Sequence, residues 1–186
     1  MYNPHLPSNA PKRSPWGTVD YAKELAPGVF TVSTPGHGGI KLDRKRNAAV
    51  PKPVRRKGGW YEEDCEYALA VLVHPEAFDE KTVEAAHDSA KNWYPEAYET
   101  LTGTKVKTEE SYTLRKRAVE EATKDKFVVR SARGDWAEDV PTGKVCVTAQ
   151  KASTGETADF LVTAAEYADR PNVGGFVVDE TKHTAC

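Results

Sequence analysis

The sequence has few cysteines and no long hydrophobic run, and each shortage excludes a class of protein. Its three cysteines are odd in number, widely spaced and without a CxxC pair, so neither a disulfide framework nor a zinc knuckle is indicated. The longest apolar run, residues 67–73, is far shorter than the roughly 20 residues that span a bilayer. We therefore expect a protein of a reducing compartment, the cytoplasm, with no membrane segment.

An excess of charge of one sign is also lacking. Lys and Arg total 26, Asp and Glu total 28, and the formal net charge is -2. This balance gives no general reason to expect a polyanionic partner, so any nucleic-acid binding must come from a local patch. Prolines recur through residues 1–15, where a signal peptide would carry its apolar segment, so secretion by that route is not expected.

Length and composition predict one domain between two tails. A chain of 186 residues with a hydrophobic fraction of 39% is in the range where a single core is usual. Residues 1–15 offer little apolar surface to bury and are interpreted as a Pro-rich N-terminal arm. Residues 16–180 are predicted to form a single α+β domain, followed by a C-terminal tail at residues 181–186.

The order of the expected elements predicts the fold class. Residues 16–42 consist of β-forming runs separated by Gly- and Pro-containing turns. Helical spacing then predicts three helices, at residues 61–73, 80–94 and 109–123. Strands return in the last third, at residues 127–132, 145–150, 160–163 and 176–178. Strands, then helices, then strands indicate an α+β fold with an antiparallel sheet and a central helical segment.

A glycine-rich turn around a histidine is the first candidate site. In the stretch STPGHGGIKL at residues 33–42, Gly36, Gly38 and Gly39 surround His37. Glycine permits close backbone approach, so the turn can direct N–H groups at an anion while His37 supplies a proton or a metal bond. The alternative is an ordinary hairpin turn with an exposed polar histidine.

An acidic block at residues 58–68 is the second candidate site. Glu62, Glu63 and Asp64 are candidates to assist His37 in catalysis. The alternative is a divalent ion, since Glu62 and Glu66 are spaced i and i+4 and could bind it together with His37. First-turn acids are equally typical of a helix start, and no HExxH or paired-Asp motif completes a site. We therefore predict no metal site and no cofactor.

The aromatic residues and the thiol of this block have different expected roles. Trp60 and Tyr61 are candidate binding residues. Cys65 near a helix start can act as a nucleophile with His37 as its base. The neighbouring carboxylates oppose thiolate formation, however, and Cys65 falls on the predicted apolar stripe. We interpret Cys65 as a buried structural residue.

Positive charge is concentrated between residues 41 and 57, where Asp43 is the single acid. A basic stretch of this kind can follow a phosphate backbone. The alternative, which we favour, is intramolecular pairing with the acids that begin at Glu62. Both clusters adjoin the Gly58-Gly59 turn. The candidate binding residues of the stretch are Arg44, Arg46, Arg55, Arg56 and Lys57.

The blocks at residues 33–39 and 60–65 resemble those of an uncharacterised protein family carried by bacteriophages and mobile elements. The opening Pro15-Trp16-Gly17 and the stretch around Gly134-Asp135-Trp136 resemble it too. The resemblance covers residues 14–80 and 126–180. It implies a mobile-element context and the cytoplasm of a host cell, and it assigns no reaction and no catalytic residue.

We therefore expect an accessory protein that acts by binding a host or phage protein rather than by catalysis. The alternative is a small hydrolase or phosphoryl-handling enzyme centred on His37. A nucleic-acid-binding module that uses residues 41–57 is the third hypothesis. Convergence of His37 and the acids in one pocket would favour the enzyme, whereas an exposed aromatic patch would favour the binding protein.

Overall fold

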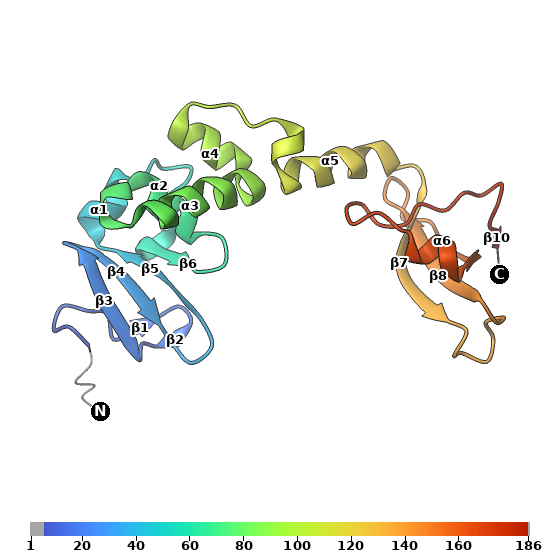
Figure 1. Cartoon of the computed structure of the whole chain (residues 1–186), viewed down its shortest axis with the longest axis horizontal. Coiled ribbons are helices and arrows are strands. Elements are labelled where there is room, and N and C mark those ends of the chain that lie inside the picture. The colour runs from blue at the N-terminus through green and yellow to red at the C-terminus, as the bar shows by residue number, and fades with distance from the viewer. Residues whose placement is uncertain (1–5, 186) are drawn as a thin grey trace. The chain divides into compact units, whose positions relative to one another are not determined.

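A computed structural model describes residues 6–185, and the chain divides into two compact units, residues 1–113 and 114–186 (Figure 1). The first five residues of the predicted arm, and residue 186 of the predicted tail, lie outside the described residues. The α+β fold class is confirmed. The division differs from the single domain predicted for residues 16–180, because the strands of the last third form their own sheet over their own apolar cluster.

The first unit is built on a four-stranded antiparallel sheet in the order β3-β4-β5-β6. A two-stranded ribbon of β1 and β2 precedes it. The strands are β1 (Arg13–Ser14), β2 (Gly17–Thr18), β3 (Tyr21–Ala26), β4 (Val29–Ser33), β5 (Gly38–Leu42) and β6 (Trp60–Glu62). Gly39 of β5 pairs with Glu62 of β6, so two segments far apart in the sequence lie side by side.

One helix lies between β5 and β6, and the others come after β6 along the chain (Figure 1). They are α1 (Arg44–Ala49), α2 (Tyr67–Val73), α3 (Glu80–Trp93), α4 (Pro95–Thr102) and α5 (Tyr112–Thr123), with 3-10 turns η1 (Lys57–Gly59), η2 (Pro75–Ala77) and η3 (Thr108–Glu110). The helix predicted after Asp79 is confirmed, since the Asp79 carboxylate accepts a hydrogen bond from the Thr82 N–H at 2.9 Å and caps α3.

Both faces of this sheet are covered. Period-2 alternation along β4 directs Val29 to the face beneath α2 and Phe30 to the opposite face. The α2 face holds the main core, with Leu42, Tyr61 and Leu69 fully buried. The opposite cluster consists of Ala10, Val19, Ala22, Phe30 and Val32, with Leu6, Trp16 and Trp60 packed against it.

The described part of the predicted N-terminal arm is therefore part of the folded unit. Ala10 is only 8% exposed, and its cluster lies on the second face of the sheet. Arg13 pairs with Thr18 in the β1-β2 ribbon. The composition of residues 1–15 did not indicate this packing, because one small residue, Ala10, is enough to join the cluster of Phe30 and Val32.

Two of the three predicted helices start later in the chain than expected. Tyr61 belongs to β6 and not to a helix over residues 61–73, because the Gly58-Gly59 turn returns the chain to β5 and the sheet buries its ring. The predicted end of the second helix is confirmed, because α3 ends at Trp93 with Tyr94 as its C-cap. Pro95 then begins α4, a helix that was not predicted, at a position where a missing N–H is tolerated. The third helix begins at Tyr112 instead of at about residue 109.

The second unit is an antiparallel meander, which agrees with the antiparallel sheet predicted from the sequence. Its sheet has the order β10-β9-β8-β7, formed by β7 (Phe127–Gly134), β8 (Lys144–Lys151), β9 (Thr157–Thr163) and β10 (Thr184–Ala185). A short helix, α6 (Ala164–Ala168), follows β9. Phe127, Val147 and Phe160 lie in its core.

The described residues of the predicted C-terminal tail are also ordered against this sheet. β10 pairs with β9, and the side chain of His183 is buried against Phe176 at a ring-centroid distance of 5.5 Å. The predicted strand at 176–178 is reduced to a bridge between Val177 and Val128. Within residues 6–185, no helix combines the length and apolar character needed to cross a membrane.

Candidate functional site

The turn between β4 and β5 fixes the backbone of His37. The Thr34 N–H donates to the His37 carbonyl at 2.7 Å, and the Thr34 hydroxyl donates to the same oxygen at 2.8 Å. That hydroxyl also accepts from the His37 N–H at 3.1 Å. Thr34 is buried, whereas the His37 side chain is 57% exposed. The turn therefore presents an imidazole to solvent from a backbone held by three hydrogen bonds.

The pairing of β5 with β6 brings two carboxylates to this imidazole. Gly39 opposes Glu62 in the sheet, and the Glu63 carboxylate accepts a hydrogen bond from the Gly38 N–H at 2.7 Å. A Cβ at residue 38 would collide with the second oxygen of that carboxylate. Glycine at position 38 therefore permits the approach of Glu63.

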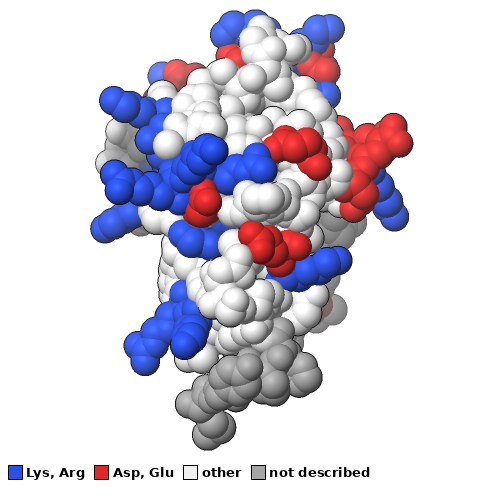
Figure 2. Space-filling model, turned by 90° about the vertical axis from the view of Figure 1, so that its left-hand side faces the viewer, with Lys and Arg blue, Asp and Glu red and all other residues white. Residues whose placement is uncertain are grey.

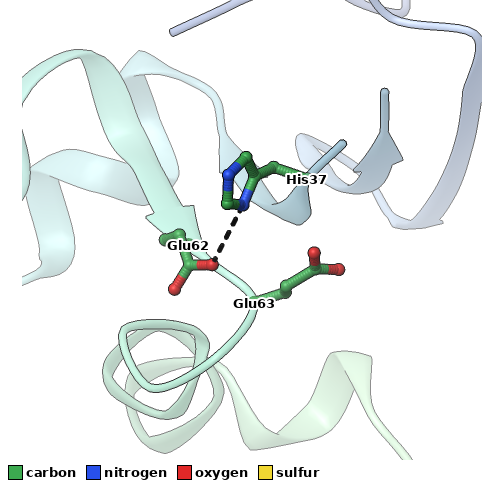
Figure 3. Close-up of side chains that lie close together, drawn as sticks. All are labelled: His37, Glu62 and Glu63. Carbon is green, nitrogen blue, oxygen red and sulfur yellow. Dashed lines mark ion pairs between the residues drawn. The ribbon is translucent and has the colours of Figure 1, made fainter. Parts of the chain in front are cut away.

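His37, Glu62 and Glu63 form one cluster (Figure 3). One nitrogen or oxygen atom of each lies within 4.8 Å of the others, and His37 Nδ1 is 3.8 Å from Glu62 Oε1. Glu62 Oε2 accepts from the Asp64 N–H at 2.8 Å. Glu62 Oε1 is shielded from solvent and has no hydrogen-bond partner among the described residues. A buried carboxylate oxygen normally has such a partner, so Glu62 Oε1 lacks the hydrogen-bond donor or cation that would compensate its burial.

One imidazole nitrogen and two carboxylates are a donor set for a divalent transition metal. Imidazole suits Zn²⁺ and Fe²⁺, and carboxylate oxygens suit Mn²⁺ and also bind Zn²⁺. Three protein ligands at an exposed position leave room for water to complete the coordination sphere. The hydrogen bond from Gly38 to Glu63 orients one ligand in the way that outer hydrogen bonds orient metal ligands.

Of the two glutamates considered as ligands of a divalent ion with His37, Glu62 lies in the cluster and Glu66 does not. Glu66, chosen for its i,i+4 spacing from Glu62, forms an ion pair with Arg56 at 2.6 Å instead. Because Glu62 lies in a strand, the helical spacing does not apply, and Glu63 takes that place in the cluster. The Asp64 side chain is exposed and lies outside the cluster.

Cys65 is only partly buried, which corrects its predicted burial on a helical stripe. It precedes α2 and lies in the turn after β6. Burial raises the pKa of the thiol above its usual value, and the negative charges of Asp64, Glu62 and Glu66 raise that pKa further. These causes support the interpretation that Cys65 is not a nucleophile.

The basic stretch separates into paired and unpaired residues. Arg56 pairs with Glu66, as predicted, but Arg46 pairs with Glu76 at 2.6 Å instead of with the acids at residues 62–66. The Arg55 guanidinium donates to two backbone carbonyls. Arg44 and Lys57 are exposed. Lys and Arg gather mainly on the left of the face drawn in Figure 2.

The two aromatic candidates have structural contacts. Tyr61 is fully buried, and its hydroxyl donates to Asn47 Oδ1 at 2.8 Å. Burial raises the pKa of the Tyr61 phenol. Trp60 is partly buried and meets Trp16 edge to face, with ring centroids 5.7 Å apart. Tyr61 therefore cannot offer a binding surface, and Trp60 offers only its remaining exposed part.

Trp136 was not named as a site residue, yet its side chain is the most exposed large aromatic of the described residues, at 81%. It lies in the connection between β7 and β8, next to Gly134. The sequence signal was the stretch Gly134-Asp135-Trp136, which stands between a strand and a Pro-containing turn.

Fold and site together define an α+β protein with a candidate cation centre in its first unit. Residues 9–124 match the model of a protein family described as a domain of unknown function, DUF7007, and the chain belongs to that family. The matched stretch contains His37, Glu62 and Glu63. Neither a curated protein nor a solved structure matches the chain.

Proposed function

We propose that this protein is a phage or mobile-element accessory protein that binds a divalent cation through His37, Glu62 and Glu63. The observation that carries the proposal is Glu62 Oε1, a solvent-shielded carboxylate oxygen without a hydrogen bond, 3.8 Å from His37 Nδ1. A cation between the two side chains would satisfy that oxygen and balance two adjacent negative charges. The mobile-element context and the host cytoplasm rest on the resemblance of the sequence blocks.

His37 and two acids converge, as the enzyme hypothesis requires, but the exposure of the cluster favours binding over hydrolysis as the role of this centre. The His37 side chain is 57% exposed, so a bound ion would share its coordination sphere with bulk water. Glu63, a candidate base, already accepts a hydrogen bond from the Gly38 N–H. A hydrolase would instead use the ion to activate a bound water in a site that excludes solvent.

Calorimetric titration with Zn²⁺ and with Mn²⁺ tests the cation centre. Glu62→Gln and His37→Ala should each weaken binding by at least about tenfold, since each removes one ligand. Asp64→Asn is the matched control, because it removes a neighbouring negative charge outside the cluster, and its affinity should stay within about threefold of the original. Equal losses of affinity in Glu62→Gln and Asp64→Asn would show that the ion binds a general acidic patch and not the proposed centre.

The exposure of Trp136 supports the second part of the proposal, that the protein acts by binding a host or phage protein. Trp136 is 81% exposed, and tryptophan is enriched among the residues that dominate protein interfaces. We propose that this residue contacts the partner. Affinity capture from infected cells should recover a partner protein with the original chain and with the His37→Ala variant. The Trp136→Ala variant should not recover that partner. Loss in both variants, or in neither, would contradict a partner site at Trp136.

A further inference from the structure

A cavity of about 420 Å³ in the first unit is lined by three cationic side chains. Lys41 comes from β5, Arg44 opens α1, and Arg55 lies in the loop after α1. Asn47 and the backbone of Gly58 complete much of the wall. This volume is within the range of small-molecule sites and exceeds what one phosphate group needs.

These three cations differ from their neighbours in the same basic stretch. Arg46 and Arg56 each meet a glutamate at 2.6 Å. Within residues 6–185, Lys41, Arg44 and Arg55 form no ion pair with a carboxylate. Unpaired positive charges therefore face one hollow in a chain whose net charge is negative.

Two of the cations are held in place. Arg55 Nε donates to the Val50 carbonyl at 2.9 Å and Nη2 donates to the Ala48 carbonyl at 2.7 Å, which fixes the guanidinium plane. The Lys41 ammonium donates to the Gly58 carbonyl and lies 4.9 Å from the centre of the Trp60 ring. Side chains fixed in this way lose little conformational freedom when they bind an anion.

The cavity is also lined by one carboxylate, that of Asp43, which already accepts a hydrogen bond. The Asp43 carboxylate caps α1 by accepting from the Arg46 N–H at 2.7 Å. Burial lowers the pKa of Lys41 below its usual value, and the charge of Asp43 partly offsets this effect. An anion beside the partly buried ammonium would favour its charged form.

We propose that Lys41, Arg44 and Arg55 form a phosphate-binding pocket, which takes a phosphate group of a nucleic acid or of a free nucleotide. Guanidinium groups bind phosphate oxygens through paired N–H donors, and lysine adds a point charge. The pocket is separate from the cation centre, because none of its three cations belongs to the cluster of His37, Glu62 and Glu63.

The experiment is a set of binding titrations of the full chain with inorganic phosphate, ATP and a fluorescent single-stranded oligonucleotide. Arg44→Glu is the test variant, because the Arg44 side chain is exposed and its replacement should not disturb the fold. Lys52→Glu is the matched control, since it makes the same change of charge at an exposed position of the same stretch, outside this cavity. Circular dichroism melting of both variants shows that they remain folded.

We expect Arg44→Glu to weaken phosphate-ligand binding at least about tenfold and Lys52→Glu less than about threefold. Oligonucleotide affinity that falls with salt identifies a nucleic-acid backbone as the source of the phosphate, whereas tighter binding of ATP identifies a nucleotide. Equal losses in the two variants, or no binding of any probe at millimolar concentration, would overturn the proposal. His37→Ala should leave phosphate binding unchanged, so this result is independent of the cation centre.

Discussion

Glu63 and Gly38 are joined by two hydrogen bonds of opposite direction. The Gly38 N–H donates to Glu63 Oε1 at 2.7 Å, and the Glu63 N–H donates to the Gly38 carbonyl at 3.1 Å. These bonds link the turn that carries His37 to the end of β6. The position of one candidate ligand therefore depends on the absence of a side chain at residue 38.

The first prediction follows from this contact. Gly38→Ala would place a Cβ against the Glu63 carboxylate and 3.0 Å from the Val32 carbonyl, so Glu63 must move. We expect cation affinity to fall about tenfold and the free energy of unfolding to fall by about 1–2 kcal/mol. Calorimetric titration and chemical denaturation measure the two effects. Gly36→Ala is the control, because a Cβ there meets nothing within 4 Å, and an equal loss in that variant would refute the explanation.

The sequence allowed the strands around this site to be predicted, but not their register. The β-forming run of β4 and a turn after it are local signals, and both are confirmed, although Gly38 and Gly39 lie in β5 rather than in the turn. Glu62 and His37 are brought together by β5-β6 pairing, and that pairing depends on which residues the sheet buries. Tyr61 was misassigned because its spacing from Cys65, Ala68 and Leu69 also fits a helix.

The unpartnered oxygen of Glu62 could not be predicted from sequence at all. Any glutamate can accept hydrogen bonds, and it is the fold that gives Oε2 the Asp64 N–H as a donor and leaves Oε1 shielded without a hydrogen-bond partner among the described residues. The same limit applies to the cavity at Arg44. Sequence reasoning treated residues 41–57 as one basic stretch, whereas the fold pairs some of its charges and leaves others facing the cavity.

The second prediction concerns the N-terminal segment. Its composition predicts that deleting residues 1–14 leaves the melting temperature almost unchanged, but the burial of Ala10 against Phe30 and Val32 reverses that expectation. Ala10→Asp should lower the free energy of unfolding by about 2–3 kcal/mol, since it buries an unpaired charge. Ser8→Asp, at an exposed position, should change it by less than about 0.5 kcal/mol. Denaturant titration compares the two variants, and equal stabilities would restore the interpretation of a loose arm.

The third prediction is an acid dependence of the second unit. Hydrogen bonds from Lys182 and Thr163 lower the pKa of Glu166 to about 2. A carboxyl group whose pKa is lower in the folded state stabilises that state above its unfolded pKa, near about 4.3, and the stabilisation is lost as the pH falls toward about 2. Melting temperatures measured from about pH 5 to about pH 2.5 should fall less steeply in Glu166→Gln than in the original protein. Parallel curves would contradict the assignment to Glu166.

The fourth prediction concerns the reactivity of Cys65. Because burial and three neighbouring carboxylates raise the pKa of its thiol, little thiolate forms near neutral pH. Iodoacetamide should therefore alkylate Cys65 in the folded protein at least about fivefold more slowly than in the urea-unfolded chain. Peptide mass spectrometry follows this residue separately from the other cysteines. Equal or faster alkylation in the folded protein would contradict the interpretation that Cys65 is not a nucleophile.

The last prediction tests whether the two compact units unfold independently. Leu69 is fully buried in the main core between α2 and the first sheet, and Val147 is fully buried in the core of the second unit. Leu69→Ala should cost about 2–5 kcal/mol and Val147→Ala about 2 kcal/mol, because each leaves a cavity in its own core. Under independent unfolding, calorimetry should resolve two transitions, of which each variant lowers one. A single transition that both variants shift would instead support the single domain predicted from the sequence, because one cooperative unit responds as a whole to the loss of either core residue.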